Sequence, residues 1–129
     1  MTPAHLKTLR ESLGISAQWL ADQAGVQRRT VQHWESGRST VPADVAAMIE
    51  RLDADFERMS DAAVEQAKAA KAEHGAPESV DLVRYRTDAA LWAAHPEMKP
   101  LPVTAHAALL YRCMRKLEAA GFAVTIDFP

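Results

Sequence analysis

Cysteine occurs once in this chain of 129 residues, so no disulfide can form within it. Cys113 lies in a helical pattern between Leu110 and Leu117, which predicts a small, buried, apolar residue. The five histidines are scattered, and none of them has zinc-ligand spacing with a cysteine. We therefore expect neither a metal site nor a cofactor.

Long apolar runs and phosphate loops are missing too. No stretch approaches the ~18 apolar residues that span a bilayer, and no cationic start precedes an apolar run. No glycine-rich phosphate loop is present. Asp53, Asp55 and Glu57 diverge around a predicted helix, while His95 and His106 flank a proline-rich loop without a paired carboxylate. The sequence thus predicts a cytoplasmic protein that is not an enzyme.

The chain has little excess of either sign of charge, since its formal net charge is only −2. Nucleic-acid binding needs a local basic patch and not a basic total, so this value excludes nothing. Residues 1–44 carry five basic and four acidic side chains, whereas the remainder is net negative. The small asymmetry has the sign expected of an N-terminal DNA-binding part.

The first third of the chain is divided by glycines into short helical patterns. Apolar residues at helical spacing predict helices at residues 4–13, 17–24 and 27–36. Ser16 can cap the second helix, because its hydroxyl can accept a hydrogen bond from an exposed amide of the first turn. Gly25, between the second and third helices, suits a left-handed turn. Two helices joined this way match the helix-turn-helix pattern.

The third of these helices has two different faces. Val31 and Trp34 are three residues apart and predict an inward face. The other face carries polar side chains that can reach base edges, Arg28, Arg29, Gln32 and His33. A helix of this kind looks like a DNA recognition helix.

Residues 43–73 carry a regular apolar seam. Its members alternate spacings of four and three, which is a heptad pattern over almost four repeats: Val45, Ile49, Leu52, Phe56, Met59, Ala63, Gln66 and Ala70. The seam predicts one long helix or two nearly collinear ones. A coiled coil is the minor alternative.

The second half of the chain follows a polar segment with Gly75 and Pro77. Alternation predicts strands at 80–86 and 122–129. Between them we expect a helix from Thr87 to His95, a proline-rich loop and a second helix capped by Thr104. Two such strands cannot form a stable sheet alone, so helices or a second copy must cover them. Homodimerisation is the simplest solution.

Several short motifs carry a family resemblance. They are Leu9-Arg10-Glu11, Leu20-Ala21, Gly25-Val26 and Val31-x-x-Trp34-Glu35-x-Gly37. On these motifs, residues 4–52 resemble the Cro/C1-type (XRE) DNA-binding domain of phage repressors. The segment from Trp34 to Val45 is similar to the YdiL-like regulators, which include the anti-CRISPR-associated regulators.

Together, pattern and resemblance predict a mainly α protein. We expect a lambda-repressor-like helix-turn-helix domain at 1–60, the end of a long helix and a linker at 61–78, and a β-α-α-β dimerisation domain at 79–129. The long helix would connect the two domains.

The resemblance implies a role for each matching position. Arg28, Arg29, Gln32 and His33 would contact bases. The sugar-phosphate backbone would be contacted by Gln18, Thr30, Ser36, Arg38 and Ser39. Arg10, Trp34 and Glu35 would be structural, with Arg10 paired to Glu35. In one departure, many relatives place glutamine at the second position of the second helix, where this sequence has Ala17. The phosphate clamp is therefore expected to be shifted to Gln18 or missing.

These roles imply a dimeric transcriptional repressor on double-stranded DNA with an inverted repeat. The resemblance further implies autoregulation of a phage or mobile-element operon, of anti-CRISPR type in the narrower group. An antitoxin with a helix-turn-helix domain is the alternative. RNA binding by the same basic surface would be an added activity.

Overall fold

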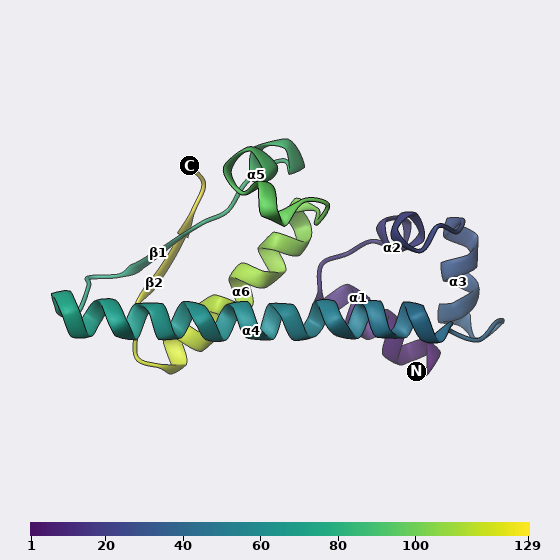
Figure 1. Ribbon diagram of the computed structural model, residues 1–129, viewed down its shortest axis with the longest axis horizontal. Coiled ribbons are helices and arrows are strands. Elements are labelled where there is room, and N and C mark those ends of the chain that lie inside the picture. Colours follow the sequence, from purple (N-terminus) through teal and green to yellow (C-terminus); the bar gives the residue numbers. More distant parts are fainter. The chain divides into compact units, whose positions relative to one another are not determined.

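The computed structural model describes residues 1–129, which form two compact units, Met1–Ala54 and Asp55–Pro129. Most of the ordered chain is helical (Figure 1). None of the helices combines the length and apolar composition needed to cross a bilayer. In chain order the elements are α1 (Pro3–Ser12), α2 (Ala17–Ala24), α3 (Arg28–Ser36), α4 (Ala43–His74), β1 (Val80–Val83), α5 (Asp88–Ala94), η1 (Pro96–Met98), α6 (Val103–Ala119) and β2 (Val124–Asp127).

The first unit contains α1, α2, α3 and the start of α4. The expected cap of α2 is confirmed, since the Ser16 hydroxyl accepts a hydrogen bond from the Trp19 amide at 3.0 Å. Thr2 caps α1 in the same way through the His5 amide. Each of these helices contributes side chains to one buried core, which includes Leu6, Leu13, Ile15, Leu20, Ala21, Val31, Trp34, Val41, Val45 and Ile49.

Helix α4 is a single helix from Ala43 to His74, which answers the question of one helix or two. The expected seam is correct only at its start, where Val45, Ile49 and Phe56 are buried. Beyond Phe56 it is wrong: Met59 is 37 % exposed, whereas Ser60 is fully buried. A straight α-helix has 3.6 residues per turn and drifts away from a strict heptad, so the buried face moves by one residue.

The second unit contains most of α4 together with β1, α5, η1, α6 and β2. The expected order β-α-α-β is found, with one 3₁₀ turn, η1, inside the proline-rich loop. Both strands are shorter than expected, at four residues each. They pair in parallel, with Val80 beside Val124 and Leu82 beside Ile126. These four apolar side chains share one half-buried face, while the alternate residues are exposed.

The start of α6 differs from the expectation that Thr104 caps it. The helix begins at Val103, directly after Pro102. The Val103 amide donates to the Asp88 carboxylate at 2.7 Å. The first exposed amide of α6 is therefore satisfied by a side chain from α5, and a negative charge lies near the positive end of the helix dipole.

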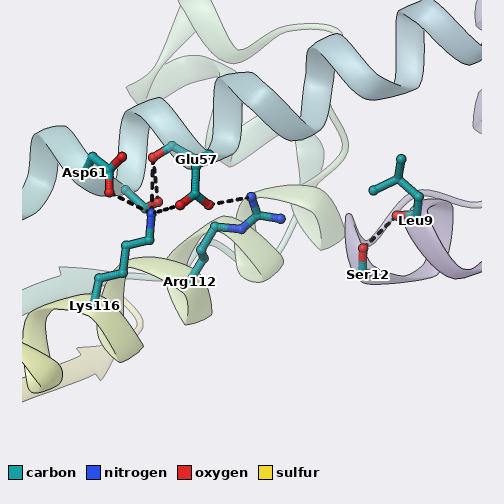
Figure 2. A network of polar contacts seen from close by, with 7 residues as sticks. Leu9, Ser12, Glu57, Asp61, Arg112 and Lys116 are labelled. Atoms are coloured by element: carbon teal, nitrogen blue, oxygen red, sulfur yellow. Dashed lines mark hydrogen bonds and ion pairs between the residues drawn. The ribbon is translucent and has the colours of Figure 1, made fainter.

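A cluster of charges joins α4 to α6 within the second unit (Figure 2). Lys116 on α6 donates to Glu57 at 2.6 Å and to Asp61 at 2.8 Å, both on α4. Arg112, one turn earlier on α6, also pairs with Glu57, at 3.3 Å. Burial alone would lower the pKa of Lys116, but its hydrogen bonds with Asp61 and Glu57 outweigh this and raise it.

Candidate nucleic-acid interface

The turn between α2 and α3 is made by Gly25. Its φ is +69°, in the left-handed region, and its amide donates to the Asp22 carbonyl at 3.3 Å. The next amide, of Val26, donates to the Ala21 carbonyl at 3.0 Å, which completes the end of α2. A side chain at Gly25 would meet open space. Glycine is therefore favoured here by its backbone conformation and not by crowding.

One face of α3 is anchored in the core of the first unit. Val31 and Trp34, three residues apart, are both buried. This matches the inward face that the sequence predicts. Because the indole of Trp34 lies in the core, it is not available to stack on a base.

A nearly buried ion pair joins α3 to α1. Arg10 donates from Nε to Glu35 Oε2 at 2.7 Å and from Nη2 to Glu35 Oε1 at 2.9 Å. Its Nη1 also donates to the Ile15 carbonyl at 3.0 Å, in the loop before α2. The two side chains are only 12 % and 9 % exposed. The hydrogen bonds with Glu35 raise the pKa of Arg10 despite its burial.

The opposite face of α3 is open to solvent. Arg28, Arg29 and Gln32 are exposed. His33 and Thr30 are half-buried. Of the four residues expected to contact bases, three are thus fully presented, whereas His33 is presented in part. An arginine and a glutamine held in this way offer the paired donors and acceptors that guanine and adenine edges match.

The loop after α3 is organised around one carbonyl, that of His33. It accepts hydrogen bonds from the amides of Arg38 at 2.9 Å and Ser39 at 3.2 Å, and from the Ser36 hydroxyl at 3.2 Å. Gly37, at φ +81°, makes the reversal. The exposed side chains of Arg38 and Ser39 therefore extend from a fixed loop, while the Ser36 hydroxyl is already engaged with its own backbone.

Gln18 has a partner that sequence reasoning missed. Its amide donates to the Asp22 carboxylate at 2.8 Å, one turn further along α2. The i, i+4 spacing of a glutamine and an aspartate was the available signal. The sequence predicts Ala17 at the second position of this helix. In the structure α2 begins at Ala17, so Gln18 is its second residue. The side-chain amide of Gln18 has two hydrogens, so it can keep Asp22 and still donate to a phosphate.

The chain brings together no three histidine, cysteine or acidic side chains that could hold a metal ion. The arrangement at α3 offers instead a rigid helix with donors on its outer face, followed by a loop that carries a cation. These are the two kinds of contact, base-reading and backbone-positioning, that protein–DNA interfaces combine.

Comparison with known proteins agrees with this geometry. Residues 4–71 match the family model described as a helix-turn-helix domain. A protein of Pyrococcus furiosus named "Putative HTH-type transcriptional regulatory protein" is 43 % identical over 47 residues. That match covers 36 % of this chain but only 15 % of the relative. The similarity is therefore to one small part of that protein.

Proposed function

This chain belongs to the helix-turn-helix domain family, and we propose that it is a sequence-specific transcriptional repressor that binds double-stranded DNA as a homodimer. The proposal rests on one observation above all. The inner face of α3 is buried through Val31 and Trp34, whereas its outer face presents Arg28, Arg29 and Gln32 to solvent. A helix held and exposed in this way fits the major groove.

The outer face of α3 determines which bases would be read. Each arginine can donate two hydrogen bonds to O6 and N7 of a guanine, and Gln32 can pair with N6 and N7 of an adenine. His33 is half-buried, so it would contribute less to base reading than the three exposed residues. RNA binding by the same surface is not needed to explain any of these side chains.

The neighbouring loop and α2 supply contacts with the phosphate backbone. Arg38 and Ser39 extend from the loop that the His33 carbonyl organises. Thr30 and Ser36, at the two ends of α3, and Gln18 on α2 are weaker contributors. Contacts of this class set the position of α3 on the duplex and carry no sequence information directly.

One α3 reads only a few base pairs, so a specific operator needs two. A two-fold dimer would place its recognition helices on half-sites about one helical turn, ~34 Å, apart and related by inverted symmetry. The second unit favours dimerisation because the outer edge of β1 in its two-stranded sheet has no strand partner.

The gene that this protein regulates is proposed to be the gene that encodes it. The segment Trp34 to Val45 resembles YdiL-like and anti-CRISPR-associated regulators, which implies autoregulation of a phage or mobile-element operon. Repression would follow when the dimer occludes RNA polymerase at an overlapping operator. Repression would then increase with the concentration of the protein itself.

A reporter fused to the DNA upstream of the gene tests this proposal. Supplying the chain in trans should lower reporter expression, and Arg29→Ala should relieve most of that repression. Arg58→Ala is the matched control, because Arg58 is an exposed arginine of α4 that pairs with Asp55. Unchanged or increased reporter expression with the wild-type chain would show that it is not an autorepressor.

A further inference from the structure

The edge of β1 that faces away from β2 has backbone groups without a strand partner. Val80 donates its amide to the Ala123 carbonyl at 2.8 Å, and Arg84 donates to the Asp127 carbonyl at 2.9 Å. Because backbone groups alternate sides along a strand, the amides and carbonyls of Asp81 and Val83 point to the other edge. The sheet contains only β1 and β2, so no strand bonds to that edge.

A groove lies beside the same strand in the second unit. Its volume is about 370 Å³, and its lining is mostly apolar. Ala63, Ala67 and Ala70 of α4 form one side, Val80 and Leu82 of β1 form the other, and Leu117 of α6 also lines it. Small side chains on α4 leave the groove unfilled at the place where the expected heptad seam ran.

We propose that a second copy of this chain docks here by adding its own β1, antiparallel, to the open edge of β1. The inference rests on the proposed dimeric function and names the surface that makes the dimer. An extended strand can satisfy alternating amides and carbonyls along this edge, and a strand that pairs with itself about a two-fold axis satisfies both edges at once.

The side chains select one register, centred on Leu82. There Asp81 lies opposite Val83 of the partner subunit, and the reverse pair follows by symmetry. Both residues have their backbone groups on the open edge, so each pair makes two hydrogen bonds and four form in total. Leu82 lies at the axis, opposite the partner's Leu82.

Charge and strand length support this register over its neighbours. A two-fold axis normal to the sheet keeps each face on its own side, so the register changes in steps of two residues. One such step leaves Val83 as the one residue of β1 that lies opposite the partner's β1. The other sets Asp81 opposite the partner's Asp81. Like charges directly opposite each other destabilise a sheet.

The same register also fills the groove. Val80 and Leu82 lie on the half-buried face of β1, toward the groove. The two-fold axis places the partner's Val80 and the partner's Leu82 on the corresponding face of the extended sheet. They therefore lie beside the small side chains of α4, where Ala63 and Ala67 leave room. The parallel strand pairs of the two copies then form the two halves of one four-stranded sheet.

Disulfide trapping tests the register. Leu82→Cys places two thiols at a non-hydrogen-bonded pair, where Cα atoms lie about 4.5 Å apart, within disulfide reach. Val83→Cys is the matched control, since its Cα atoms would be about 8 Å apart, beyond the ~7 Å limit for a disulfide. Diamide accepts the two hydrogens, and Cys113 is buried in both variants. Denaturing gels should show at least ten-fold more covalent dimer for Leu82→Cys than for Val83→Cys.

Sedimentation equilibrium separates the two ways of failing. If the wild-type chain is a dimer but Val83→Cys links as readily as Leu82→Cys, this interface is wrong and the proposed function stands. If the chain is a monomer both alone and on operator DNA, the dimeric function fails as well.

A second variant keeps the proposal testable if Leu82→Cys distorts the fold. Val83→Pro removes one amide of the open edge and no hydrogen bond between β1 and β2. It should raise the dimer dissociation constant at least ten-fold with unchanged far-ultraviolet circular dichroism. An unchanged dissociation constant in this variant overturns the inference.

Discussion

Arg10 and Glu35 form a bidentate, nearly buried ion pair that joins α1 to the C-terminal half of α3, at 2.7 and 2.9 Å. Glu35 follows Trp34 directly, so a packed indole and a paired carboxylate hold the same turn of the helix. The carboxylate lies close to a surface proposed to bind a polyanion. Its charge is neutralised by Arg10, and we therefore propose a structural role for Glu35.

Glu35→Ala should destabilise the first unit and leave the base preference unchanged. Removing one partner leaves Arg10 charged and nearly buried, at a cost of about 3–5 kcal/mol. Urea unfolding followed by tryptophan fluorescence measures this loss, since Trp19 and Trp34 lie in that unit. Sites selected by the folded variant should match those of the wild type.

Arg58→Ala is the control for this prediction. Arg58 and Asp55 also form an ion pair, at 2.9 Å, but their side chains are 70 % and 39 % exposed. An exposed pair of this kind contributes about 0–1 kcal/mol. Retained stability with an altered base preference in Glu35→Ala would contradict the structural role of Glu35.

Arg29→Ala should relax the preference at one position of the selected site. An arginine that makes a bidentate contact with guanine contributes about 1–3 kcal/mol of discrimination against other bases. Binding to a panel of operators with single substitutions measures this directly. A loss of affinity that is equal for all operators would show that Arg29 contacts the backbone and not a base.

Arg38→Ala should weaken binding to all sequences alike. A phosphate contact releases about one counterion, so the slope of log K against log salt should fall by about 1. Titrations between low and moderate salt give this slope for the wild type and the variant. An unchanged slope would remove Arg38 from the set of phosphate contacts.

Acid should destabilise the second unit through His106. Its side chain is buried, Nδ1 has no hydrogen-bond partner, and the rings of Tyr85 and His95 lie 5.7 and 6.3 Å away. Burial, and then the charge of His95, lowers the pKa of His106 below its ordinary value of 6.5. The folded state thus binds fewer protons than the unfolded state. Stability is complete above pH 6.5 and falls as the pH drops toward the folded pKa.

The His106 ring protons report this titration by nuclear magnetic resonance, and their midpoint should lie below pH 6.5. His106→Phe should flatten the pH dependence of urea unfolding below that pH. His74→Gln is the control, since the His74 side chain is 73 % exposed and should leave the dependence unchanged. A His106 midpoint above 6.5 would show that its charged form is stabilised in the fold.

Local signals in the sequence were sufficient for most of the first unit. Gly25 and Gly37 mark helix ends because both need a left-handed backbone, and Ser16 marks a start because its hydroxyl caps an amide. The two faces of α3 follow from the spacing of Val31 and Trp34. The pairing of Arg10 with Glu35, which are 25 residues apart, was available only through the family resemblance.

Tertiary contacts explain what the sequence did not predict. The cap of α6 comes from Asp88, which is 15 residues earlier and has no local signature. The shift of the buried face of α4 from Met59 to Ser60 follows from helix geometry over many turns, which a heptad count ignores. Strand lengths were overestimated because alternation continues past the residues that pair.

The central claim is that two copies of α3 read a symmetric DNA site. Selection of bound sites from random duplex DNA by the purified full chain tests it most directly. The account predicts an inverted repeat whose half-sites are about one helical turn, ~34 Å, apart. It also predicts a guanine in each half-site that loses enrichment with Arg29→Ala. The absence of any enriched motif, or a single asymmetric motif, would contradict the account.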